Sequence, residues 1–307
     1  MGIVVIGATF VDIKGFPEDT YVPTGRNVGR VEYIHGGVAR NVVEDIANVE
    51  LRPTFLGIVD DTPMGADVLQ KLNNHKVNTQ YVMTIPGGMG TWLAVFNNNG
   101  DVAGSISKRP NMLPIVDLLE EKGDEIFSQA DSVVLEVDLD KEIVKATLDL
   151  AQKHKVKVFG LVSNMNIAAK RRDFLRSFNC FICNQLEAGL LFLDDYTEHS
   201  PEQMRQVLAQ KVVQAQIPSM VVTMGDRGAV YATVDGLSGI CPARKVHVKD
   251  TTGAGDAFCA GVSIGLTYGK TMAEAIEIGS ILAASVITSS ENVCPRFQPA
   301  ELGIEFQ

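Results

Sequence analysis

The chain has 307 residues, of which 46% are hydrophobic and 21% charged, and its formal net charge is −10. A chain of this length and composition buries a large core without disulfides or metal ions, and intrinsic disorder is excluded. The acidic balance argues against binding to nucleic acids or anionic membranes, which favour a basic surface. A small anion is still compatible, because a local group of backbone N–H donors can hold a phosphate on an acidic protein.

The cysteine pattern and the absence of targeting signals predict a cytoplasmic protein. The single C-x-x-C pair, Cys180 and Cys183, lies in an apolar run that reads as a strand, and no partner at zinc spacing follows it. Five cysteines without a paired framework indicate a reducing compartment. No basic segment precedes the first apolar run, and no uncharged apolar stretch is long enough to span a bilayer, so we expect neither a signal peptide nor a membrane partner.

The predicted elements alternate between strands and helices along most of the chain. Residues 3–7 form a β-branched run that ends in Gly, which is typical of a buried parallel strand. Further strands are predicted at residues 53–59, 132–135, 156–161, 180–183, 220–223 and 229–234, with a short hairpin up to 248. Helices are predicted at residues 38–49, 64–72, 141–153, 168–178, 186–193, 201–214, 254–268 and 272–288.

Two segments break the alternation, at about 12–35 and 80–107. The second contains three short strand patterns, at 81–83, 91–96 and 102–106, separated by Gly-Gly and Asn-Gly turn signals. We expect the two inserts to form a small β-sheet lid, and we treat residues 1–307 as one domain. An exposed, apolar lid edge at 92–96 would favour pairing with a second copy, so a homodimer through the lid is predicted.

The alternating part of the chain predicts an α/β fold with a doubly wound, mainly parallel sheet and helices on both faces. In such sheets ligands bind beyond the carboxyl ends of the strands. Candidate site residues are therefore sought directly after strands.

The sequence Asp-Thr-Thr-Gly-Ala-Gly-Asp at 250–256 is the strongest chemical signal. A predicted β segment at 245–248 leads into it and an apolar helix follows. Small residues at a helix start leave backbone N–H groups uncovered, and with the helix dipole they form an anion hole. Asp256 would repel a bound phosphate unless it takes a proton from an attacking hydroxyl, which is what phosphoryl transfer to an alcohol requires. The alternative is that Asp256 simply caps the helix.

Two further features suit the acceptor of such a transfer. Gly36 and Gly37 precede a helix and allow the backbone to approach a ligand closely, and Asn41, one turn later, both donates and accepts hydrogen bonds. Asp12 follows the first strand, where a carboxylate can accept from two hydroxyls. Each has a structural alternative, as a tight turn, a surface amide or a cap.

Together these pieces resemble the ribokinase-like (PfkB) family of carbohydrate kinases over nearly the whole chain. Gly-Gly-Val-Ala-Arg-Asn at 36–41 and Asp-Thr-Thr-Gly-Ala-Gly-Asp at 250–256 are similar to the two family signatures. The N-x-x-E at 184–187 and Thr-Met-Gly-Asp-Arg-Gly at 223–228 resemble two further family elements in the expected order.

The resemblance implies a Mg²⁺- and ATP-dependent kinase with the following roles. Asp256 would be the base, and the N–H groups of Gly253, Ala254 and Gly255 the anion hole. Asp12, Gly36, Gly37 and Asn41 would hold the hydroxyls of the acceptor. Asn184, Thr223, Gly225, Gly228 and Ser280 would contact ATP, and Glu187 would hold Mg²⁺ through water. Asp250 and the Thr252 carbonyl correspond to positions that bind K⁺ in ribokinase.

The acceptor stays open between a nucleoside and a free sugar. Within the family, the signature at 36–41 and the Val162-Ser163 pair resemble the pseudouridine kinase branch. That branch places a Lys soon after Val-Ser, whereas here Asn164-Met-Asn166 follows and the first lysine is Lys170. Ribose, fructose or a related sugar is the alternative acceptor. Lys108 and Arg109 either reach the site from the lid edge or are solvated loop charges, and we favour the second interpretation. A silent relative that binds a ligand and regulates a partner is the alternative of another class, although such proteins usually lose the base or the anion hole.

Overall fold

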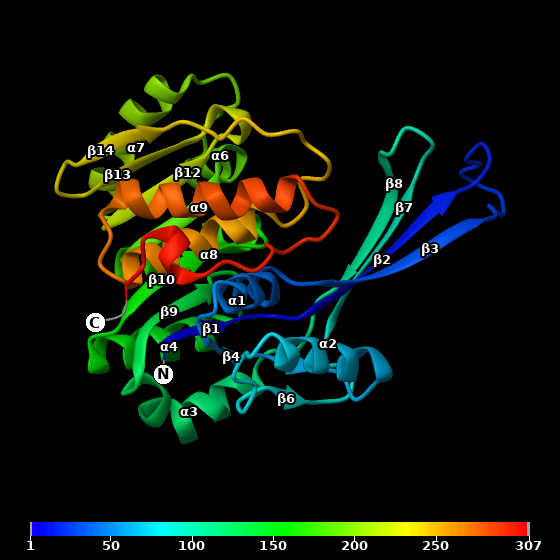
Figure 1. The fold of residues 1–307 in the computed structure, drawn as a ribbon, viewed down its shortest axis with the longest axis horizontal. Coiled ribbons are helices and arrows are strands. Elements are labelled where there is room, and N and C mark those ends of the chain that lie inside the picture. The colour runs from blue at the N-terminus through cyan, green and yellow to red at the C-terminus, as the bar shows by residue number, and fades with distance from the viewer. Residues whose placement is uncertain (1, 306–307) are drawn as a thin grey trace.

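The computed structural model describes residues 2–305 and consists of a layered α/β body from which a β-sheet projects (Figure 1). The main sheet has eight strands in the order β14-β13-β12-β11-β10-β9-β1-β4. The strands from β4 to β12 are parallel, and β13 and β14 continue the sheet antiparallel. Their bounds are β1 (Gly2–Ile6), β4 (Thr54–Leu56), β9 (Ala130–Glu136), β10 (Lys157–Leu161), β11 (Cys180–Asn184), β12 (Ser219–Thr223), β13 (Ala229–Thr233) and β14 (Ser238–Cys241).

The helices cover both faces of this sheet, as the alternating sequence predicts. They are α1 (Val38–Asn48), α2 (Pro63–Asn74), α3 (Pro114–Phe127), α4 (Lys141–His154), α5 (Met165–Ala168), α6 (Gln185–Phe192), α7 (Pro201–Ala215), α8 (Ala254–Thr267) and α9 (Met272–Ile287). Ile3 and Val5 of β1 pack into a cluster with α1, α2, α8 and α9. Val4 and Ile6 of the same strand point to the other face, toward α3 to α7. This alternation is the period of two of a strand buried on both sides.

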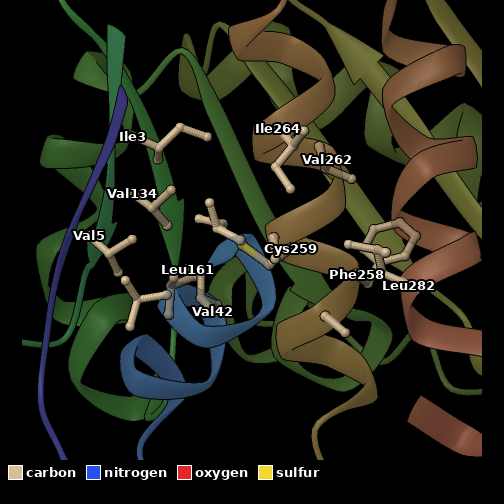
Figure 2. Close-up of a cluster of buried hydrophobic side chains, with 14 of the residues drawn as sticks. Ile3, Val5, Val42, Val134, Leu161, Phe258, Cys259, Val262, Ile264 and Leu282 are labelled. Atoms are coloured by element: carbon tan, nitrogen blue, oxygen red, sulfur yellow. The ribbon is translucent and has the colours of Figure 1, made fainter. Parts of the chain in front are cut away.

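The helix that carries the candidate base is anchored deep in the first of these clusters. Figure 2 shows Val42 of α1 and Cys259 of α8 gathered with Val134 and Leu161 of the sheet. On its other side α8 packs against α9 at a glycine crossing, where a Cβ on Gly261 would lie 2.6 Å from Gly279 Cα. The N-terminus of α8 is therefore held by a rigid, close-packed core.

The projecting sheet has four strands in the order β3-β2-β7-β8 (Figure 1). They are β2 (Phe10–Pro17), β3 (Gly29–Gly36), β7 (Gly90–Phe96) and β8 (Val102–Lys108). We call this sheet the lid. The strand expected at 81–83 was assigned to the lid, and this assignment is wrong. The strand observed there, β6 (Met83–Thr84), pairs with β5 (Ile58–Val59) in a separate two-stranded sheet.

Several other expectations from the sequence are corrected. The lid strand that contains Trp92 and Phe96 is an inner strand, paired with β2 and β8, so it is not a free edge. Residues 245–248 are irregular rather than a β segment, and the predicted helix at 168–178 is mostly a 3₁₀ helix with a kink at Arg171. The helix α3 was not predicted, because Gly123 in its interior weakens the helical pattern. Among the described residues 2–305, no helix is both long enough and apolar enough to cross a membrane.

Candidate active site

The ends of the parallel strands bring predicted residues, such as Asn184 and Thr223, together with others that were not predicted. Ala8 follows β1, Glu136 ends β9, Ser163 follows β10, Asn184 ends β11 and Thr223 ends β12. Because these strands are parallel neighbours, their carboxyl ends form one rim of the sheet. The N-termini of α1 and α8 meet over this rim, and a hydrogen bond between Asn41 and Asp256 joins them.

Asp256 lies in the first turn of α8, next to an opening in the protein surface. Gly253 precedes the helix in the left-handed conformation, with φ of 82°. A Cβ on Gly255 would meet no atom within 4 Å, so the space above the helix N-terminus is open. The N–H of Ala254 donates to Thr251 O (3.2 Å), whereas those of Gly253 and Gly255 have no acceptor within residues 2–305. Two backbone N–H groups without an acceptor and the positive end of the helix dipole thus face this space.

Asn41 links the candidate base to the acceptor side. Its Nδ2 donates to Asp256 Oδ2 at 2.6 Å, and its Oδ1 accepts from Asn292 Nδ2 at 3.3 Å. Both contacts fix the orientation of the amide. The structure therefore brings Asn41 and Asp256 together, although 215 positions separate them in the sequence.

Asp12 lies against the Gly36–Gly37 turn that precedes α1. A Cβ on Gly36 would lie 2.7 Å from Asp12 Oδ1, so only glycine leaves room for this carboxylate. Gly37 has φ of 97°, and a Cβ there would approach Ala8 O to 2.6 Å. Gly36 is thus required by the close approach of Asp12, and Gly37 by its backbone conformation and the nearby Ala8 carbonyl.

Arg40 holds this turn in place, a role that the sequence did not reveal. Its side chain is only 1% exposed, and it donates to Glu44 Oε2 at 2.7 Å, to Gly36 O at 3.3 Å and to His35 O. Removing one partner of a buried ion pair leaves an uncompensated charge and typically costs ~3–5 kcal/mol. The only sequence signal is an arginine four residues before a glutamate in an apolar helix.

The surroundings of Asp256 raise the pKa of its carboxyl into the range that would suit a base at neutral pH. Burial raises the pKa of its carboxyl to about 6, with smaller contributions from the charges of Glu187 and Asp12. The Asn41 hydrogen bond and the Arg40 charge act in the opposite direction. Above pH 6 the group is ionised and still basic enough to accept a proton from an alcohol as that alcohol attacks.

Asn184 and Glu187 form a capping box at the start of α6. Asn184 Oδ1 accepts from the Glu187 N–H at 2.9 Å, and Glu187 Oε2 accepts from the Asn184 N–H at 2.7 Å. Glu187 also faces Asp138 and Asp256 closely enough to interact with both charges, and burial raises its pKa. The predicted pair thus caps a helix, while Glu187 Oε1 remains available to a ligand.

The next turn along the rim contains the other candidate nucleotide contacts. Gly225 and Gly228 have φ of 62° and 92°, and they close a tight turn after β12 in which Met224 N donates to Gly228 O at 2.7 Å. Arg227 ties this turn to the neighbouring loop by donating to His199 O (2.8 Å) and Gln185 Oε1 (2.6 Å). Ser280 lies on α9, and no hydrogen bond among residues 2–305 links it to this turn.

Asp250 and Thr252 lie on the far side of the α8 N-terminus. Asp250 Oδ1 accepts from the Thr252 N–H at 2.9 Å, and this bond lowers the pKa of the Asp250 carboxyl. Both residues border a cavity of about 320 Å³ whose lining includes Ser290, Glu291 and Asn292 but also Lys14, His35 and Lys71. The residues predicted to hold a monovalent cation thus share a cavity with two cationic lysines, and the charge of Lys14 acts on Asp250.

Two buried carboxylates at the end of β9 were missed by the sequence analysis. Glu136 and Asp138 are 2% and 1% exposed. Glu136 Oε2 accepts from the Ala8 N–H at 2.9 Å, and both Asp138 oxygens accept from Ser163, at 2.8 Å each. Burial and the charge of Asp138 raise the pKa of Glu136. The available signal was a pair of acidic residues at the end of an otherwise apolar strand.

The interpretation of Arg109 as a solvated charge is also wrong. Its Nη2 donates to Asp138 O at 2.9 Å and lies 3.8 Å from Asp138 Oδ2. Lys108 donates to Gly87 O and Met89 O at the base of the lid instead. Of two adjacent cations, one therefore borders the site and the other fastens a loop.

The carboxylates of the site fit a Mg²⁺ ion that is bound mainly through water and phosphate. In residues 2–305, no three His, Cys, Asp or Glu side chains lie close enough to hold a metal by themselves. Mg²⁺ usually keeps several waters and uses one or two carboxylates together with phosphate oxygens. Glu187, with Asp138 and Asp256 nearby, supplies that kind of donor set.

Comparison with known proteins agrees with this geometry. Residues 2–294 match the model of the pfkB family carbohydrate kinase. The guanosine-inosine kinase of Exiguobacterium acetylicum is 34% identical over 294 residues, which cover 94% of this chain and 95% of that enzyme. The pseudouridine kinase of Escherichia coli strain K12 is 26% identical over 276 residues, covering 89% and 86%. Arabidopsis thaliana ribokinase, complexed with ribose and ATP, shares the fold, with a TM-score of 0.86 at 20% identity over 99% of both chains.

Proposed function

Because the chain belongs to the pfkB family of carbohydrate kinases, we propose that it transfers the γ-phosphoryl group of ATP to the primary hydroxyl of a 6-oxopurine nucleoside such as guanosine or inosine. The contact that carries the kinase chemistry is the 2.6 Å hydrogen bond between Asn41 and Asp256. It joins an acceptor-binding amide to a base at the mouth of an anion hole. The preference for a purine nucleoside rests on the similarity to the guanosine-inosine kinase, which spans nearly the full length of both chains.

In this mechanism Asp12, the Gly36–Gly37 turn and Asn41 hold the hydroxyls of the acceptor. Asp256 takes the proton of the primary hydroxyl as its oxygen forms a bond to the γ-phosphorus. The bond from that phosphorus to the oxygen of the leaving ADP breaks at the same time. The N–H groups of Gly253 and Gly255 and the N-terminus of α8 stabilise the charge on the transferred group.

The nucleotide lies on the β11–β12 side of the rim in this proposal. Asn184, Thr223, Gly225 and Gly228 border ATP there, and Ser280 is the outermost contact. Glu187 would hold Mg²⁺ through water, and the ion would neutralise charge on the phosphates. Asp250 and the Thr252 carbonyl would hold K⁺.

The lid offers a surface for a second copy of the chain, although not the edge that the sequence suggested. Tyr33, Ile13, Leu93 and Ile106 lie directly opposite one another across all four strands. Tyr33 is 60% and Ile106 71% exposed. We propose that this apolar row, on the face opposite Asp12, packs against the same row of a second copy, because contiguous exposed apolar patches mark interaction sites.

A coupled measurement of ADP release tests the substrate. The purified protein would be assayed with Mg²⁺, K⁺ and ATP against guanosine, inosine, adenosine, pseudouridine, ribose and fructose. We expect the highest kcat/KM with guanosine or inosine. Preference for pseudouridine would contradict the purine assignment and would favour the pseudouridine kinase branch, which the N-terminal signature resembles. Turnover of free sugars alone would contradict the nucleoside assignment. Turnover of none of these acceptors would contradict it as well.

A further inference from the structure

A cavity of about 200 Å³ opens beside Glu136, at the carboxyl ends of β1, β9 and β10. Its volume is several times the ~30 Å³ share of a water molecule, so it accommodates a ring system. Phe10, Met112 and Leu139 provide apolar walls, and the polar side chains are Arg109, Glu136, Asp140 and Ser163. Apolar walls with a few placed polar groups are the usual composition of a small-molecule site.

The cavity belongs to the acceptor side of the cleft. Its strand β9 is separated from β12, which leads to the Gly225–Gly228 turn, by β10 and β11. At ~4.8 Å per strand, that places the nucleotide turn about 14 Å away along the rim. On the near side, Ala8 borders the cavity and also contacts the Gly37 turn, and Asn41 lies about 6 Å further along α1 at ~1.5 Å per residue. A pentose held at Asn41 and Asp256 would thus be near enough for its nucleobase to reach the cavity.

Glu136 and Ser163 have hydrogen-bond partners in the protein, whereas Arg109 and Asp140 keep polar atoms that the protein does not satisfy. Arg109 uses Nη2 for Asp138 O, and its Nε and Nη1 have no hydrogen-bond partner in the described part of the chain. Asp140 is the N-cap residue of α4, yet its carboxylate makes no capping hydrogen bond. Nη2 keeps a second N–H, which forms a donor fork with either Nε or Nη1, so a fork and a carboxylate acceptor remain for a ligand.

Resting on the proposed function, we propose that this cavity receives the base of the nucleoside and that Arg109 and Asp140 select a 6-oxopurine over adenine. Hypoxanthine and guanine present two acceptors, O6 and N7, which match the donor fork of an arginine. Their N1–H is a donor that a carboxylate accepts, and guanine adds its 2-amino group. The arrangement thus complements both bases with one pair of side chains.

Adenine reverses this pattern at two positions. Its 6-amino group would place a donor against the guanidinium of Arg109, and its unprotonated N1 would place a lone pair against the carboxylate of Asp140. Sites built to hydrogen-bond a particular group reject analogues that lack it, because their own polar groups are left unpaired. The cavity therefore discriminates by repulsion as well as by attraction.

The experiment compares kcat/KM for inosine, guanosine and adenosine in Arg109→Gln and Asp140→Asn. In R109Q we expect kcat/KM for inosine and guanosine to fall on the order of 10–100-fold, mainly through KM, with adenosine changing far less. In D140N the amide can donate to the N1 of adenine, so the adenosine-to-inosine ratio should rise on the order of 10-fold. Lys141→Gln and Glu142→Gln, which make the same charge changes on exposed neighbours, should leave all ratios unchanged.

The outcomes separate this inference from the proposed function. If the protein phosphorylates inosine and guanosine but both variants retain the discrimination of the parent, the assignment of Arg109 and Asp140 is wrong while the nucleoside kinase stands. If the parent accepts only free sugars, the proposed function fails and the base site with it. Should R109Q not fold because its contact to Asp138 is lost, D140N alone decides, since the Asp140 carboxylate has no hydrogen bond to lose within residues 2–305.

Discussion

The two ends of the acceptor cleft are encoded in different ways. The end proposed to bind the phosphoryl group, formed by Gly253–Asp256 and Asn41 and called the phosphoryl end, comes from two short contiguous stretches of sequence, 36–41 and 250–256. The end proposed to bind the nucleobase is the cavity beside Glu136. Its lining consists of single residues from segments around 8–10, 109–112, 136–140 and 163. Chemistry at this site is therefore local in the sequence, whereas the surface proposed to recognise the base is assembled by the fold.

The physical reason lies in what each end requires. Uncovered N–H groups at a helix start and a left-handed glycine are local backbone properties, so a few adjacent residues specify them. A cavity needs walls from several elements, whose proximity depends on strand order. A motif can thus identify a kinase before its acceptor is known. Variants at the phosphoryl end should therefore change kcat, whereas variants at the nucleobase end should change the preference among acceptors.

The largest effect is expected for Asp256→Asn at the phosphoryl end. The amide cannot take the proton of the attacking hydroxyl, so kcat should fall ~10²–10⁴-fold, while KM for the nucleoside changes little. The free energy of unfolding should not fall, because the variant removes a desolvated charge. Steady-state kinetics and a denaturant titration would check both. Asp149→Asn, an exposed carboxylate of α4, is the matched control, and equal activity of the two variants would contradict a base at position 256.

The two glycines of the anion hole should respond differently to alanine. Gly253 has φ of 82°, and a Cβ there would lie 2.0 Å from Asn292 O, so Gly253→Ala should lower the free energy of unfolding by ~1–3 kcal/mol. Gly255→Ala meets no protein atom within 4 Å, so stability should be retained. Its methyl group would enter the open space that the phosphoryl group needs, and kcat should fall on the order of 10²-fold. Full activity of G255A would show that the phosphoryl group is held elsewhere.

The body of the fold follows from sequence periodicity, and the lid only in part. Continuous apolar strands and amphipathic helices predicted the parallel sheet, because each depends on neighbours in the chain. The partner of a short strand is a tertiary property, so the strand at 81–83 was assigned to the wrong sheet and the inner strand at 92–96 to an edge.

The candidate site divides in the same way. Its glycines, Asn41 and Asp256 were found because they occur in motifs that place backbone at a ligand. Arg109 and Lys108 are adjacent cations with no pattern to tell them apart, and only the fold shows which one reaches Asp138. Glu136 was overlooked because a strand-end carboxylate has no spacing rule of its own.

The lid gives a prediction outside both ends of the cleft. Ile106→Glu would place a charge in the apolar row shared with Tyr33 and Leu93, and burial of one such side chain is worth ~1.5–3 kcal/mol. By light scattering we expect the parent to have about twice the mass of one chain. The Kd of the variant dimer should be on the order of 10–100-fold higher than that of the parent. Ser105→Glu is the control, since its neighbour position points to the other lid face. A monomeric parent at working concentration would contradict dimerisation through this row.

The smallest expected effect at the phosphoryl end is a shift in the pH dependence of kcat/KM, which reports the ionisation of Asp256. Since the pKa of Asp256 is raised to about 6 and its ionised form is the base, kcat/KM should rise tenfold per pH unit below 6 and level off above it. The Asn41 hydrogen bond favours the ionised carboxylate, so Asn41→Ala should raise this pKa and move the acidic limb upward by about one unit. Asn74→Ala, on the exposed side of α2, should leave the limb in place. Because the limb reports ionisation and not affinity, a shift in N41A would be separable from weaker acceptor binding, and an unmoved limb would mean that Asn41 does not tune the base.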